Sequence, residues 1–261
     1  QRQMCIRDSS GALGAETVAK APKDGYTMLM TSQGPLQLVP HLRKTGYDPL
    51  TDFSIVGRMG EQTVAIVAYR GIGARNLVEF IELARRNPGK YSYGTAGVGS
   101  LNHVRGETLK LKAGIDLLHI PYKGVAEALP DLLSGQISLL FDTNVLSHGR
   151  SGMVTLLAMM QDERHPAFPD VPTMKEQGLP DYDVPGWYGA FVPAGVPQPV
   201  LERMRAEIAT IHSDPDFQAR QLAAGNKIYT ESLTLDQMKT RFDAQYAFFG
   251  DVIRKADIRL E

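Results

Sequence analysis

Short apolar runs alternate with helical segments along most of this chain, and this alternation narrows the possible folds more than any other feature. The apolar runs predict strands at 26–30, 64–68, 91–95, 117–120, 137–141, 154–159 and 187–192. Helices are predicted at 10–21, 101–112 and 124–134, and wherever apolar residues recur every three or four positions, as in Leu77–Ala84. Strands separated by helices are typical of βαβ units, so we expect an α/β protein with mostly parallel sheet.

Length and charge further limit the number of lobes and the kinds of partner that we expect. A chain of 261 residues favours two lobes. Its formal net charge of −1 provides no basic field that would attract nucleic acid, so we expect no nucleic-acid partner. The single cysteine excludes an internal disulfide.

Most sequence signatures of enzymes are missing. The chain has no His-Glu-x-x-His motif, no phosphate loop ending in Gly-Lys-Ser/Thr, and no Gly-x-Ser-x-Gly elbow after a strand. Its six histidines stand apart, without metal-ligand spacing. We therefore expect no catalytic residue, no metal and no cofactor.

The segment Tyr93–His103 is the sharpest candidate for a binding site. A strand runs into glycines and then into a helix that Ser100 can cap. Glycines bring bare backbone close to a ligand, and the free N–H groups of a helix start suit a carboxylate or phosphate. The same pattern fits a tight turn with a plain N-cap, and spacing favours neither interpretation.

Three further candidates also follow predicted strands. They are Tyr122 with Lys123, Asp142, and Thr31 with Ser32. Asp142 can face a crevice or cap the next segment, and the sequence favours the cap. Open α/β sheets bind ligands at the carboxyl ends of their strands. The common position of the four candidates therefore predicts a ligand site.

Residues 1–9 are expected to be a non-native leader. They lack the apolar core of a signal peptide and the periodicity of a helix or strand. Met4–Asp8 can be encoded by ATG TGT ATA AGA GAC, which looks like the end of a sequencing adapter. On this hypothesis Cys5 is foreign to the natural protein.

Several sequence blocks carry a family resemblance. They include Ala19–Thr27, Tyr93–Ser100 with His103, Pro121–Gly124, Asp131–Gln136, Pro169–Thr173 and Pro193–Pro197. In this order they resemble the substrate-binding proteins of tripartite tricarboxylate transporters, the Bug or TctC-like family. The resemblance covers Ser10 to the C-terminus. It implies a two-lobed, periplasmic-binding-protein-like fold of type II, whose lobes are joined by a hinge of crossing strands.

The resemblance also implies lobes and a site. Lobe I would comprise 10–66 and 187–261, and lobe II 67–186. Ligand-binding residues would be Thr31 and Ser32 from lobe I and Thr95, Ala96, Gly97, Ser100, Tyr122, Asp142 and Thr143 from lobe II. The ligand would be a small carboxylate, passed by a periplasmic monomer to the membrane permease subunits of a transporter.

Departures from the family pattern create further expectations. A signal peptide, a first strand and a ligand-contacting loop would normally precede Ser10, so we expect lobe I to lack them. Pro130 lies in a helix usually free of proline and is expected to kink or split it near Leu129.

Two other functions stay open at this stage. A binding protein of this kind can serve a sensor kinase in place of a permease. An enzyme acting on a phosphorylated small molecule would need a base beside Ser100, and only His103 is near in sequence.

Overall fold

The computed structural model describes residues 11–142, 146–161, 163–180, 182, 184, 186–223, 226–227 and 233–260. The described residues form two compact units. Unit 1 contains those of 1–62 and 186–254 with Leu260, and unit 2 contains those of 63–185 with Lys255–Arg259.

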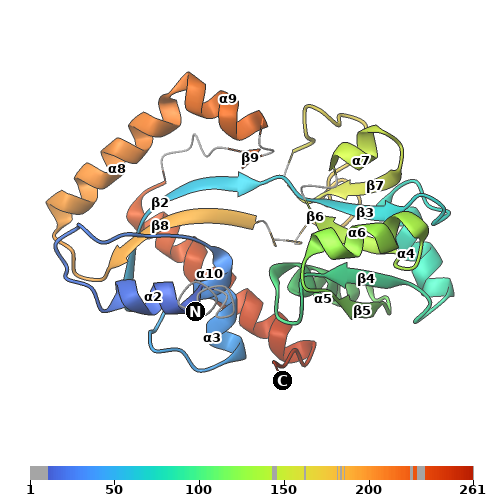
Figure 1. Cartoon of the computed structure of the whole chain (residues 1–261), viewed down its shortest axis with the longest axis horizontal. Helices are drawn as coiled ribbons and strands as arrows, with labels where there is room; N and C mark the ends of the chain where they lie inside the picture. The colour runs from blue at the N-terminus through green and yellow to red at the C-terminus, as the bar shows by residue number, and fades with distance from the viewer. Residues whose placement is uncertain are drawn as a thin grey trace. The chain divides into compact units, whose positions relative to one another are not determined.

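The sheet of unit 1 is antiparallel throughout (Figure 1). Its strands lie in the order β1 (Leu29–Ser32), β8 (Gly186–Pro193), β2 (Phe53–Gln62) and β9 (Asn226–Lys227). The strand predicted at 26–30 therefore begins at Leu29 and runs on to Ser32. Strand β2 was not predicted, because two register shifts along its pairing with β8 break the simple alternation of buried side chains.

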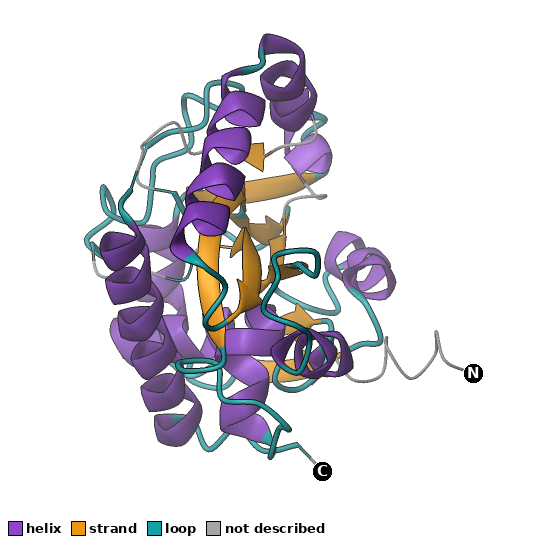
Figure 2. Cartoon of the chain, turned by 90° about the vertical axis from the view of Figure 1, so that its left-hand side faces the viewer, coloured by secondary structure: helices purple, strands orange, loops and turns teal. Residues whose placement is uncertain are grey.

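Helices cover both faces of this sheet (Figure 2). Alternate residues of β8 point to opposite faces, so Trp187 and Phe191 join one core while Ala190 and Val192 join the other. The first core is closed by α2 (Ala12–Ala19), the π-helix η1 (Gly34–Leu38), α3 (Val39–Leu42) and α10 (Leu235–Lys255). The second is closed by α8 (Gln198–Ser213), which leads into α9 (Pro215–Ala223).

The sheet of unit 2 is mixed. Its order is β5 (Leu118–Pro121), β4 (Ser92–Thr95), β6 (Leu139–Asp142), β3 (Ala65–Tyr69) and β7 (Val154–Met159). Strand β4 is parallel to β5 and β6, whereas β3 is antiparallel to β6 and β7. With unit 1 wholly antiparallel, the prediction of mostly parallel sheet was wrong. Strand direction depends on long-range pairing, which local patterns do not contain.

The helices of unit 2 are α4 (Leu77–Arg86), α5 (Leu101–Ala113), α6 (Val125–Ser134) and the short α7 (Leu146–Arg150). Of the two expected effects of Pro130, a kink or a split near Leu129, the split was wrong, because α6 continues through Pro130. Pro130 and Ala126, whose carbonyl loses its helical partner there, are both exposed, so water can satisfy that carbonyl.

In the described part of the chain, no helix has the combination of length and apolarity that crossing a bilayer requires.

Candidate functional site

The turn from β4 into α5 has the geometry that both interpretations of Tyr93–His103 require. Thr95 is fully buried at the end of β4, and Gly97 and Gly99 have φ values of 106° and 74°. Those values lie in the region that glycine adopts without strain. Ser100 is the N-cap of α5, and its Oγ accepts a hydrogen bond from the His103 backbone N–H at 3.3 Å. The plain capping role is therefore confirmed.

Hydrogen bonds within the turn occupy most of its amides. Gly97 N–H donates to Thr95 Oγ1 at 3.2 Å, Gly99 N–H to His103 Nδ1 at 3.1 Å, and Ser100 N–H to the Gly97 carbonyl at 3.3 Å. The amides of Leu101 and Asn102 have no acceptor among the described residues. These two donors lie in the first turn of a 13-residue helix, where the helix dipole favours an anion.

Tyr122 lies beside this turn but uses its hydroxyl proton elsewhere. Its backbone N–H donates to the Thr95 carbonyl at 3.0 Å, and its hydroxyl donates to Asp131 Oδ2 at 2.7 Å. Desolvation and the hydrogen bond to Asp131 raise the pKa of Tyr122 to about 12. The phenol oxygen can still accept a hydrogen bond, but its single proton is directed to Asp131.

Strand direction explains where the remaining candidate residues of unit 2 lie. Because β4, β5 and β6 are parallel, their carboxyl ends meet at one edge of the sheet. Asp142 ends β6 at this edge and is half-buried. Ala96 is exposed and Gly97 half-buried in the turn after β4. Thr143 lies outside the described residues.

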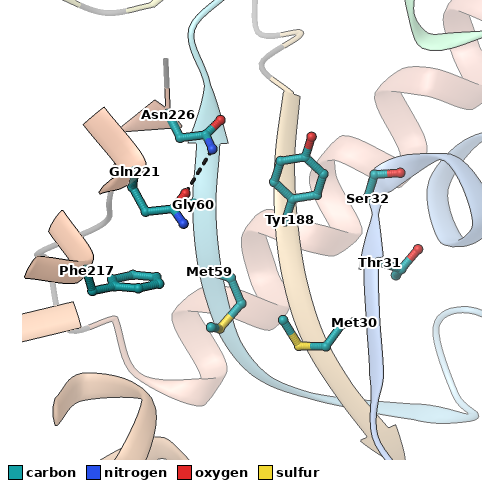
Figure 3. A pocket seen from close by; sticks show the side chains of 9 residues that line it. All are labelled: Met30, Thr31, Ser32, Met59, Gly60, Tyr188, Phe217, Gln221 and Asn226. Carbon is teal, nitrogen blue, oxygen red and sulfur yellow. Dashed lines mark hydrogen bonds between the residues drawn. The ribbon is translucent and has the colours of Figure 1, made fainter. Parts of the chain in front are cut away.

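Thr31 and Ser32 line a pocket in unit 1 with a volume of about 560 Å³ (Figure 3). The other lining residues are Met30, Met59, Gly60, Tyr188, Phe217, Gln221 and Asn226. They come from β1, β2, β8, α9 and β9, so no local motif joins them. Sequence reasoning missed these seven because only sheet pairing brings such distant segments together.

The pocket of unit 1 combines apolar walls with neutral polar groups. Two methionines and Phe217 supply apolar surface, and Asn226 Nδ2 donates to Gln221 Oε1 at 2.8 Å. None of its nine lining residues carries a charged side chain. Such a lining suits an apolar or neutral hydrogen-bonding group.

The side chains near Ser100 do not form a nucleophile and base pair. His103, the nearest histidine in sequence, directs Nδ1 to the Gly99 amide, while Ser100 Oγ bonds the His103 backbone. Among the residues that the structure describes, no group of three or more His, Cys, Asp or Glu is placed to hold a metal ion.

The described residues form two α/β units, and polar residues stand at the ends of strands in each of them. Residues 6–255 match the family model of the tripartite tricarboxylate transporter family receptor. The chain therefore belongs to this receptor family, and both the fold class and the resemblance seen in the sequence are confirmed.

Individual relatives agree with this assignment. A UPF0065 protein in the tcbD-tcbE intergenic region of Pseudomonas sp. (strain P51) is 35% identical over 211 residues, which are 80% of this chain and 63% of that protein. The periplasmic binding protein BugD is 32% identical with a TM-score of 0.76, over 97% of this chain and 85% of BugD. An R. palustris protein solved with adipate is 27% identical with a TM-score of 0.78, over 96% of this chain and 84% of that protein.

The match spans 63% of the length of the Pseudomonas relative. The family and its solved relatives are periplasmic solute-binding proteins and not enzymes. The expectation of a non-catalytic protein is confirmed at the level of the family.

Proposed function

We propose that this protein is a periplasmic receptor that captures a small carboxylate and delivers it to the permease of a tripartite tricarboxylate-type transporter. The observation that carries the proposal is the start of α5, where the amides of Leu101 and Asn102 are unused beside a glycine turn. Solved relatives with bound adipate and bound malate support a carboxylate as the ligand class.

The available groups are sufficient for useful affinity. Micromolar binding requires about −8.2 kcal/mol, and each hydrogen bond to a charged group contributes about 1.5–3 kcal/mol. The two unused amides at the start of α5 supply two such bonds to a carboxylate, and burial of the ligand's apolar part supplies the remainder.

The lining of the unit 1 pocket suits an apolar or neutral polar ligand group. Met30, Met59 and Phe217 can cover an apolar chain, and the hydroxyls and amides can bond a neutral polar end. A second full charge buried there would have no cationic side chain of the pocket to pair with.

Thermal-shift and calorimetric titration of the whole chain with acetate, malate and adipate test the proposal. The neutral analogue adipamide is the matched ligand control. We expect at least one carboxylate to raise the melting temperature and adipamide to leave it unchanged. Equal shifts for adipate and adipamide would show that the anion is not recognised.

A pair of variants separates binding from capping. Ser100→Ala removes the cap of α5 and should cost about 1 kcal/mol of stability. Asn76→Ala removes the equivalent cap of α4, where Asn76 Oδ1 accepts from Glu79 N–H at 2.9 Å. Only Ser100→Ala should weaken carboxylate binding. Blocking the turn with Ala96→Trp, an exposed position, should abolish it.

A further inference from the structure

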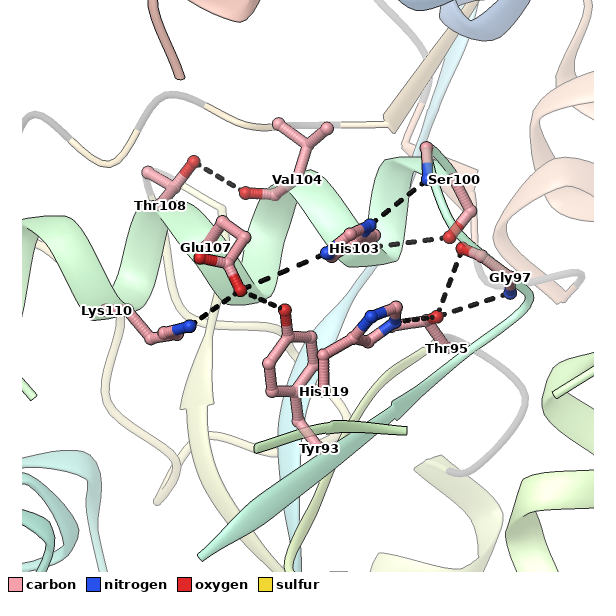
Figure 4. A network of polar contacts seen from close by, with 11 residues as sticks. Tyr93, Thr95, Gly97, Ser100, His103, Val104, Glu107, Thr108, Lys110 and His119 are labelled. Carbon is pink, nitrogen blue, oxygen red and sulfur yellow. Dashed lines mark hydrogen bonds and ion pairs between the residues drawn. The ribbon is translucent and has the colours of Figure 1, made fainter. Parts of the chain in front are cut away.

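Two histidines stack directly behind the candidate carboxylate turn (Figure 4). His103 comes from α5 and His119 from β5, and their ring centroids lie 3.7 Å apart with planes inclined by 12°. His103 is only 7% exposed. The ring of Tyr93 lies against the pair, 5.1 Å from His119 and 6.3 Å from His103. Neither ring has a role in the proposed ligand contacts.

Each imidazole holds a different end of the turn. His103 Nδ1 accepts the Gly99 N–H at 3.1 Å. His119 Nε2 lies 2.7 Å from Thr95 Oγ1, which also accepts the Gly97 N–H at 3.2 Å. The stacked rings therefore connect the first and last parts of the turn. They add to the bonds that Ser100 N–H and Thr95 Oγ1 donate to the Gly97 carbonyl.

The hydrogen bond from the Gly99 N–H requires one particular protonation state of the His103 imidazole. An imidazole nitrogen accepts a hydrogen bond only with a free lone pair, so the proton of His103 resides on Nε2. That nitrogen lies 4.0 Å from Glu107 Oε1. A doubly protonated His103 would direct a second N–H at the Gly99 N–H, and the two donors would repel.

The groups around the pair also disfavour a charged ring. From α5, Glu107 Oε1 accepts from Tyr93 Oη at 2.6 Å and from Lys110 Nζ at 2.9 Å, so its charge is already compensated. From β4 and β5 the facing titratable groups are Tyr93 and the other histidine. Burial, together with the positive charge of Lys110, lowers the pKa of His103 to about 4. Burial, together with repulsion from His103 when that ring is protonated, lowers the pKa of His119 to about 4.

We propose that His103 and His119 are positioning residues: through the hydrogen bonds of their neutral rings they hold the 95–100 turn in the conformation that leaves the Leu101 and Asn102 amides open to a carboxylate. This inference rests on the proposed function for its purpose, but the positioning itself is a property of the ligand-free protein. Neither histidine touches the ligand. Protonation or loss of the Nδ1 acceptor releases Gly99 and disorders the turn.

Matched substitutions separate the acceptor from the ring. His103→Asn keeps an acceptor near the Nδ1 position but loses the stack, whereas His103→Phe keeps an aromatic ring and loses the acceptor. With adipate and malate as probes, we expect His103→Phe to bind at least tenfold more weakly and His103→Asn to retain affinity within threefold. Thr108→Val is the control, because it removes the buried bond from Thr108 Oγ1 to the Val104 carbonyl (2.7 Å) on the same helix without touching the turn. It should leave affinity unchanged.

Wild-type affinity of His103→Phe would overturn the proposal while leaving the receptor function intact. Failure of the unmodified chain to bind any probe would overturn the proposed function instead, and a ligand-free measurement then decides the positioning role. Nuclear magnetic resonance of the unmodified chain between pH 3.5 and 8 should show His103 with its proton on Nε2 and the Gly99 amide signal shifting in step with protonation of His103. A Gly99 signal that stays constant while His103 titrates would overturn the inference, whatever the variants do.

Discussion

The backbone N–H of Trp187 donates to Oε1 of Gln33 at 3.2 Å inside unit 1. Gln33 is 1% exposed, and its Nε2 donates to Gln37 Oε1 at 3.1 Å and to Gln245 Oε1 at 3.4 Å. Gln245 Oε1 also accepts from the Trp187 indole at 2.9 Å. This amide network fixes the chain directly after Ser32, at the wall of the unit 1 pocket.

Gln33→Met removes these bonds at nearly constant side-chain shape. Because the Trp187 N–H and the partner amides stay buried, we expect a loss of about 1–3 kcal/mol in the free energy of unfolding. Urea unfolding followed by fluorescence of Trp187, the only tryptophan, measures it. Gln198→Met, at an exposed glutamine bonded to Glu202, should change stability by less than about 0.5 kcal/mol. Equal effects of the two variants would contradict the role of the network.

Two helical glycines should respond in opposite directions to alanine. A Cβ on Gly106 would lie 2.1 Å from Cε2 of the fully buried Tyr93, so Gly106→Ala forces this ring to move. A Cβ on Gly14 meets nothing within 4 Å. We expect Gly106→Ala to cost about 1–3 kcal/mol and Gly14→Ala to add about 0.5–1 kcal/mol. Thermal unfolding of both variants tests this, and a stabilised Gly106→Ala would refute the packing of Tyr93 on α5.

Pro130 should destabilise α6, so that its replacement stabilises the protein. The helix continues through it without a backbone N–H at that position, so Pro130→Ala restores the bond to the Ala126 carbonyl. We expect about 1–3 kcal/mol of added stability, below the full propensity difference because proline also restricts the unfolded chain. Urea unfolding checks the gain. A loss of stability would mean that the proline ring makes contacts that favour the fold.

Stability should fall as the solution is acidified from pH 6.5 toward 4.5. The pKa of His103 and of His119 is about 4 in the folded protein and 6.5 when unfolded, so in this window the unfolded chain binds protons that the folded chain does not. Each such proton lowers the free energy of unfolding by up to about 1.4 kcal/mol per pH unit. The contribution is complete above pH 6.5 and declines below it.

Urea midpoints measured across this window test the prediction. His119→Asn, which cannot titrate there, should reduce the slope relative to the unmodified chain. His41 and His165, which are both half-buried and whose pKa values are also lowered by desolvation, contribute to the remaining slope. A slope that His119→Asn leaves unchanged would show that His119 titrates normally in the folded state.

Features that depend on neighbours in the chain could be predicted from the sequence. Helix α4 begins at the apolar residue Leu77 of its periodic pattern, β7 spans Val154–Met159 as predicted, and Ser100 caps α5, because periodicity and capping involve only a few consecutive residues. The order of the family blocks likewise identified the receptor family.

The pairing of distant segments could not be predicted from local sequence. The antiparallel direction of unit 1, the pocket joining Met30 to Asn226, and the contact of His103 with His119 each require sheet register between separate strands. That register is set by burial of whole faces, a property of the assembled sheets and not of any short stretch of sequence.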